Sequence, residues 1–189
     1  LERDLDLVCL DVRDLEDQPM PAGRLRERPS ALARASLVLL TRIEAASEAE
    51  LRALEERLSP ERTFRVARRV QGWTALDGAA AATPARGYLL AAIARPERFE
   101  RDVARSGVDV LGRAFFRDHH RFRPDELAEV ASRARAAGAD AIVTTAKDAV
   151  RLEGAFVSGV PVVVLGIAAE ILDEGRLRAR LLSVAGRAA

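Results

Sequence analysis

The chain has 189 residues, 49% of them hydrophobic, which predicts one or two folded domains with a real core rather than a disordered segment. Its net charge of +1 argues against a broad basic surface for nucleic acid, so no nucleic-acid partner is expected. Lys147 is the one lysine among 30 lysines and arginines, and it lies in Thr-Thr-Ala-Lys-Asp. A loop that cradles nucleotide phosphates needs Gly-Lys-Ser/Thr, so this chain encodes no such P-loop.

Short apolar runs alternate with amphipathic segments along the chain, which is typical of an α/β fold with a mostly parallel sheet. Near the N-terminus, such runs predict buried strands at residues 7–10 and 36–40. Ser47 with Glu50 three positions later forms a capping box that predicts the start of a helix. The lone cysteine, Cys9, is expected to be a buried apolar residue rather than a nucleophile, and it excludes a disulfide framework. The apolar stripe expected on the helix consists of Leu51, Leu54 and Leu58.

A ribbon-like linker is expected in the middle of the chain, at residues 63–84. Its first part, 63–70, has the alternating character of a strand, and the Gly/Ala-rich remainder suits a connection or a hairpin. We therefore predict an N-terminal region at 1–62, which carries an Arg/Glu loop, and a C-terminal α/β lobe at 85–189.

The C-terminal lobe repeats the alternation of strands and helices. Pro96 and Pro124 each suit the first turn of a helix, and a last helix is expected to use Leu177, Leu181 and Leu182 as its apolar face. The predicted fold is α/β, with a mostly parallel sheet flanked by helices in a Rossmann-like arrangement. The strands expected in this lobe span residues 88–93, 108–116, 141–145 and 162–165.

The densest group of polar side chains spans residues 117–123 and contains both histidines of the chain, His119 and His120. It follows a predicted strand, and ligands of α/β proteins bind beyond the carboxyl ends of strands. Histidine exchanges protons near neutral pH, and the adjacent Asp118 could fix its tautomer. Four neighbouring arginines would suit a phosphate group. We therefore favour a catalytic site here over a solvated basic turn.

Two further segments carry candidate residues. A loop bounded by Pro and Gly holds Arg26 and Glu27 after the first strand and could bind an anionic ligand, although charged loops are usually solvated. Residues 144–148 place two threonines, Lys147 and Asp148 at another strand end. A threonine that caps the next helix and an ordinary ion pair between Lys147 and Asp148 would explain that segment equally well.

Five segments of the chain, taken in order, resemble the C-terminal part of the tetraacyldisaccharide 4′-kinase family, the lipid A 4′-kinases. Pro-Ala-Gly-Arg-Leu-Arg-Glu resembles the family's Pro-Ala-Gly-x-Leu-Arg-Glu loop, and Phe-Arg-Asp-His-His resembles its Phe-x-Asp-His-His motif. No single motif is decisive, but five in the right order make chance agreement small. The matching segments span residues 3–11, 21–29, 93–99, 116–120 and 144–152.

The chain also departs from the family pattern. Leu-Glu-Asp-Gln at 15–18 stands where the family has Gly-Asn-Gly, Ala94 replaces a glycine, and Ala146 replaces the usual Glu. The family's P-loop, its proposed catalytic Asp and its Asp-Asp-Gly-Phe-Gln-His motif would all lie before Leu1. We therefore expect the chain, which does not begin with Met, to be a piece of a longer protein.

The resemblance implies a lobe related to the P-loop kinases, with residues 1–62 as the end of its nucleotide-binding part. The whole enzyme would use ATP and Mg²⁺, both bound mainly by the missing N-terminal half, and this fragment alone would be inactive. It would phosphorylate the 4′-hydroxyl group of the lipid A disaccharide precursor, tetraacyldisaccharide 1-phosphate, in lipopolysaccharide synthesis. The enzyme would act peripherally at the membrane surface, on the cytoplasmic face of the bacterial inner membrane.

The resemblance also assigns roles to residues. His119 matches the family histidine that pairs with the upstream catalytic Asp, and Asp118 would orient His119 or its loop. Arg26 would contact a phosphate group, and Glu27 would position Arg26 or the nucleotide. Lys147 and Asp148 are carried over only as motif residues.

Two other classes of function remain open at this point. The Asp-His-His triplet suggests a metal-dependent phosphoesterase, but such enzymes need further ligands on separate strands. Asp4, Asp6 and Asp11 show no convincing ligand pattern, so no metal site is predicted. The remaining alternative is a non-catalytic α/β lobe that binds protein or lipid.

Overall fold

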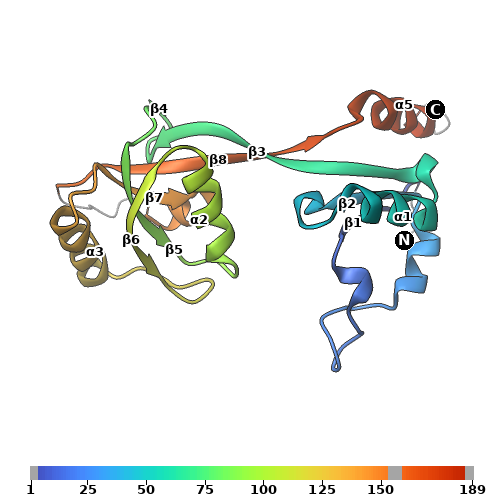
Figure 1. Ribbon diagram of the computed structural model, residues 1–189, viewed down its shortest axis with the longest axis horizontal. Helices are drawn as coiled ribbons and strands as arrows, with labels where there is room; N and C mark the ends of the chain where they lie inside the picture. Colours follow the sequence, from blue (N-terminus) through green and yellow to red (C-terminus); the bar gives the residue numbers. More distant parts are fainter. Residues whose placement is uncertain (1–3, 153–158, 186–189) are drawn as a thin grey trace. The chain divides into compact units, whose positions relative to one another are not determined.

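The computed structural model describes residues 4–152 and 159–185 of the chain, in two compact units (Figure 1). Unit 1 contains the described residues up to Arg69 together with those from Ala169 onward, and unit 2 contains Val70–Ala168. Two strands, β3 (Thr63–Ala75) and β8 (Val162–Ile171), have residues in both units and are neighbours in the strand order. The chain therefore leaves unit 1 through β3 and returns to it through β8.

Unit 1 is built on parallel strands. β1 (Leu7–Asp11) pairs with β2 (Leu37–Thr41), which pairs with β3, and all these pairs are parallel. β1 lies at one end of the strand order, and its Leu7 and Cys9 are exposed. The expectation that Cys9 is buried is therefore wrong, because an apolar run on an end strand is covered less completely than one inside a sheet.

Two helices pack on opposite faces of this sheet. α1 (Glu48–Leu58) starts at the predicted capping box, in which Ser47 and Glu50 bond each other reciprocally. Its buried leucines join the cluster around Val38 and Leu40 on one face. On the other face, α5 (Glu174–Ala185) packs against β2 and β3. The buried side chains of that second cluster are Leu37, Phe64 and Leu177.

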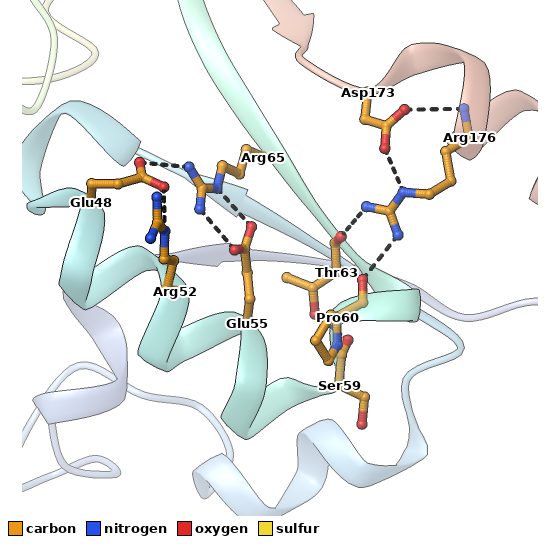
Figure 2. Close-up of polar contacts among 9 residues, drawn as sticks. All are labelled: Glu48, Arg52, Glu55, Ser59, Pro60, Thr63, Arg65, Asp173 and Arg176. Atoms are coloured by element: carbon orange, nitrogen blue, oxygen red, sulfur yellow. Dashed lines mark hydrogen bonds and ion pairs between the residues drawn. The ribbon is translucent and has the colours of Figure 1, made fainter.

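Arginines reinforce both helix contacts (Figure 2). Arg65 of β3 donates to Glu55 of α1 through Nε and Nη2 at 2.6 and 2.7 Å. Arg176 of α5 donates to the backbone oxygens of Pro60 and Thr63 at 2.9 and 2.8 Å, and its guanidinium lies 4.1 Å from the centre of the Phe64 ring. These contacts fix α5 in unit 1. The 3₁₀ helices of this unit are Asp14–Glu16, Pro29–Arg34, Ile43–Ala45 and Pro60–Arg62.

The elements of unit 2 between β3 and β8 are β4 (Ala80–Ala81), β5 (Arg86–Ala91), α2 (Pro96–Arg105), β6 (Asp109–Phe115), α3 (Pro124–Ala136), β7 (Ala141–Thr145) and α4 (Ala146–Leu152). The parallel sheet has the order β8-β7-β5-β6, and β3 forms an antiparallel hairpin with the short β4. The helices α2 and α3 cover opposite faces of this sheet (Figure 1). The alternation along β5 explains this, since Leu89 and Ala91 face α2 whereas Tyr88 and Leu90 face α3.

The predicted α/β class with a mostly parallel sheet is confirmed. Two other expectations, the extent of the C-terminal lobe and the apolar face of the last helix, differ from the structure. We expect residues 85–189 to form one lobe, whereas the described residues from Ala169 onward group with unit 1, because β8 continues back into it. The expected apolar face of the last helix is wrong beyond Leu177, since Leu181 and Leu182 are exposed. None of the described helices has the length and apolar character needed to cross a membrane.

Candidate functional site

The carboxyl ends of three parallel strands meet at one edge of the unit 2 sheet. β5 pairs in parallel with both β6 and β7, so the residues that follow these strands converge there. The Asp-His-His segment follows β6, and Lys147 and Asp148 lie in the first turn of α4, directly after β7. Candidate site residues that are distant in the sequence are therefore brought together, as expected of a ligand site in a parallel α/β sheet.

The two adjacent histidines have different surroundings. The His120 ring stacks on Phe116, with centroids 4.7 Å apart, and meets Phe122 edge-on. Its Nε2 lies 2.8 Å from Oε2 of Glu126. This contact is the largest cause that holds the pKa of Glu126 below its usual value, and the bond from the backbone N–H of Arg123 is the next largest. His120 is thus fixed within the fold.

His119 is presented outward instead. Its backbone is left-handed, with φ = 64°, so the loop turns sharply at this residue, and its N–H donates to the oxygen of Ala92 at 3.3 Å. The side chain is 72% exposed. Nδ1 lies 3.2 Å from an Nη2 of Arg151, and Nε2 lies 3.6 Å from Oδ2 of Asp118, beyond hydrogen-bond range. His119 is the histidine whose Nε2 is available to a ligand.

The expected partners of Lys147 and Asp148 need correction. Lys147 does not pair with Asp148; its Nζ donates to Oδ1 of Asp118 at 2.9 Å. This bond is the main reason that the pKa of Asp118 is lowered. Asp148 pairs with Arg151, and the helix cap is Thr145, whose Oγ1 accepts from the Asp148 N–H at 3.1 Å. The Asp118 carboxylate therefore bonds Lys147 and the backbone N–H of His119, whereas the His119 ring lies beyond hydrogen-bond range of it.

Arg151 is the residue that the sequence reasoning missed. It lies within the quoted 144–152 segment, and the Asp148–Arg151 spacing of three residues on a helix was a signal for a pair. The structure places its guanidinium between the buried Asp148 and the exposed His119.

Arg26 and Glu27 lie in unit 1, next to a cavity of about 500 Å³ whose lining includes Cys9 and Leu10 of β1. Glu27 forms an ion pair with Arg34, on the 3₁₀ helix that follows the loop, rather than with Arg26. The expected role of Glu27 in positioning Arg26 or the nucleotide stays a prediction. The lining combines apolar side chains with three arginines and three acidic residues, namely Arg26, Arg28, Arg34, Asp6, Asp14 and Glu27.

The described part of the chain shows neither clustered metal ligands nor a lysine placed in a phosphate-binding loop. Across residues 4–152 and 159–185, no group of three or more His, Cys, Asp and Glu side chains is placed to hold a metal ion. The sole lysine is engaged by Asp118 rather than lying in a phosphate-binding loop.

Comparison with known proteins gives consistent results. The family model for tetraacyldisaccharide-1-P 4′-kinase (LpxK) matches residues 1–186. A tetraacyldisaccharide 4′-kinase of Anaeromyxobacter sp. (strain Fw109-5) is 43% identical over 163 residues, which cover 80% of this chain and 43% of the relative. A protein of the same name from Geobacter metallireducens is 36% identical over 162 residues, covering 80% of this chain and 45% of the relative.

A solved structure, described as the "apo" form of LpxK from Aquifex aeolicus in complex with ATP, is similar with a TM-score of 0.66. It is 21% identical in sequence, and the match covers 97% of this chain and 53% of that one, so the likeness concerns the fold. The chain spans less than half the length of the curated relatives described above.

Proposed function

Because this chain belongs to the tetraacyldisaccharide-1-P 4′-kinase family, we propose that it is part of an enzyme that phosphorylates the 4′-hydroxyl group of tetraacyldisaccharide 1-phosphate with ATP. One observation carries the proposal to specific residues. The family-like Asp-His-His segment lies where three parallel strands end, and it presents His119 outward while His120 is held inside the fold. This is the arrangement expected of one catalytic and one structural histidine.

Phosphoryl transfer depends on positioning and on charge stabilisation more than on covalent chemistry by the protein. The 4′-hydroxyl oxygen bonds to the γ-phosphorus, the bond from phosphorus to the bridging oxygen breaks, and ADP leaves. The hydroxyl proton must be taken up as this happens. We assign its uptake to a dyad formed by His119 and a carboxylate from the part of the enzyme outside this chain, with Asp118 and Lys147 holding the loop that carries His119.

The cavity of unit 1 that Arg26 lines supports a second assignment. Arg26 is assigned to a phosphate group of a substrate, because guanidinium matches phosphate geometry. Glu27 shapes this loop through its ion pair with Arg34. Replacing Arg26 by Met should raise the KM for one of the two phosphate-bearing substrates more than it lowers kcat.

The lipid nature of the acceptor supports a further proposal on location. The full-length enzyme would bind the cytoplasmic face of the bacterial inner membrane as a peripheral protein. Fractionation of cells that express the full-length protein should then recover it with inner membranes, from which alkaline carbonate releases it. Recovery in the outer-membrane fraction would contradict this location.

A kinase assay with labelled ATP tests the proposed activity. The full-length parent should transfer label to the 4′ position of tetraacyldisaccharide 1-phosphate. The 189-residue chain alone should not transfer label, because it lacks the Gly-Lys-Ser/Thr loop that binds ATP phosphates. Failure of the full-length parent would refute the proposed function. Robust turnover by the isolated chain would refute the assignment of ATP binding to the remainder of the enzyme.

A further inference from the structure

We infer that Arg151 is a positioning residue that fixes the tautomer of His119, so that the ring offers an N–H at Nε2 to its catalytic partner. The inference rests on the proposed role of His119 and extends it. It also gives a function to the 144–152 segment, for which Lys147 and Asp148 by themselves suggest none.

First, the buried carboxylate of Asp148 holds Arg151 in place. The Asp148 side chain is fully buried, and its two oxygens accept bonds from the backbone N–H of Ala92 at 3.0 Å, from Oγ1 of Thr145 at 2.9 Å and from Nη1 of Arg151 at 3.1 Å. A buried carboxylate persists only when it is paired and hydrogen-bonded in this way. The ends of β5 and β7 and the start of α4 are thereby tied to one group.

The second step is the orientation of the guanidinium. The Arg151 side chain is only 22% exposed, and its Nη1 also reaches the oxygen of Ala92 at 3.3 Å. That same oxygen accepts the backbone N–H of His119. Because the guanidinium is planar, fixing Nη1 between Asp148 and Ala92 also fixes the direction of Nη2, which points at Nδ1 of His119 at 3.2 Å.

The third step concerns the proton on the ring. Arginine has five N–H donors and no acceptor, so a bond between Nη2 and Nδ1 requires Nδ1 to be the acceptor. The neutral His119 ring then carries its hydrogen on Nε2. The Asp118 carboxylate, which lies on the Nε2 side, is compatible with this assignment.

The two members of the proposed dyad therefore have different roles. An imidazole that offers Nε2–H donates a hydrogen bond to the partner carboxylate and orients it. The carboxylate, rather than His119, then accepts the proton of the 4′-hydroxyl group. Arg151 touches no substrate in this scheme and acts only through His119.

The direct test is nuclear magnetic resonance of the full-length enzyme labelled with ¹⁵N-histidine, with the His119 signals identified by their loss in His119→Gln. We expect Nδ1 to resonate as an unprotonated nitrogen and Nε2 as a protonated one. Arg151→Met should shift both toward an average of the two tautomers. Arg151→Lys should not restore the signals, since one ammonium group cannot reproduce the planar fork. Arg133→Met serves as the matched control, because it removes an exposed arginine paired on the surface of α3.

Kinetics provide the second readout. Arg151→Met should lower kcat about tenfold or more and leave the KM of the acceptor unchanged. This effect is within the range of interaction energies that double-mutant cycles give for residues in direct contact. In the His119→Ala background, the same change should cost no further activity. Where Arg151→Met fails to fold, Arg151→Met combined with Asp148→Asn removes both charges of the buried pair and takes its place.

The inference would be overturned by tautomer signals that Arg151→Met leaves unchanged, or by a further loss of kcat when Arg151→Met is added to His119→Ala. A normal kcat for His119→Ala has a different meaning, since it would refute the role of His119 in the proposed function. The ¹⁵N signals would then still decide whether Arg151 fixes the ring.

Discussion

Replacing Asp148 by Asn removes the charge of a fully buried carboxylate while keeping its size. The carboxylate accepts from Ala92, Thr145 and Arg151, whereas an amide has one oxygen and turns an NH₂ group toward one of these donors. One buried donor left unsatisfied costs about 1–3 kcal/mol, and breaking a buried pair costs about 3–5 kcal/mol. Because Arg151 retains some solvent contact, we expect a loss of about 3 kcal/mol, near the lower end for a buried pair.

This loss corresponds to a fall in Tm of about 6–12 °C at about 2–4 °C per kcal/mol for a chain of this size. Thermal unfolding followed by circular dichroism measures it, and amide hydrogen exchange at Ala92 should accelerate in parallel. Asp109→Asn, at an exposed position of β6, is the matched control and should stay within about 0.5 kcal/mol. A Tm change in Asp148→Asn no larger than in this control would show that the buried network does not stabilise unit 2.

Three further outcomes are expected. Lys147→Met should raise the pKa of Asp118 toward its usual value, because the bond from Lys147 is the main cause of its lowering, and carboxyl ¹³C titration measures the shift. The stability that this lowered pKa confers is present above the unfolded-state pKa and is lost as the pH falls through the folded-state value, so Lys147→Met should weaken the pH dependence of Tm in acid. Ser47→Ala should cost about 1 kcal/mol, since it removes the cap shared with Glu50; a loss below a few tenths in denaturant unfolding would contradict this. Leu177→Ala should cost about 2–5 kcal/mol in the same assay because its side chain is buried, and an unchanged midpoint would show that α5 is not docked.

Local signals predicted the elements well where a single segment determines its own structure. The capping box at Ser47 and the prolines at 96 and 124 each start a helix as expected. The lengths of β3 and β8 were missed, because long-range pairing decides them. Gly166 looks like a break in an apolar run, yet a Cβ there would lie 3.3 Å from the backbone oxygen of Gly72, so glycine instead permits close approach within a continuing strand.

The candidate site shows the same limit more clearly. Residue types and order were enough to select the Asp-His-His segment. They could not show which histidine faces outward, because Phe116 and Glu126, which hold His120, act through tertiary contacts. The partner of His119 lies 32 residues further along the chain, and only the parallel arrangement of β5, β6 and β7 brings the two together.

The central claim, that His119 serves the transfer of phosphate to the 4′-hydroxyl group, is tested most directly by kcat of the full-length parent and its His119→Ala variant. General acid–base catalysis contributes about 10²- to 10⁴-fold, and the accepting carboxylate depends on His119 for its orientation, so we predict a fall in kcat of at least about 100-fold with the Tm preserved. His120→Asn should instead lower the Tm and have a much smaller effect on kcat, because His120 lies within the aromatic cluster. A kcat of His119→Ala within about twofold of the parent value, far below the effect of losing general acid–base catalysis, would contradict the account.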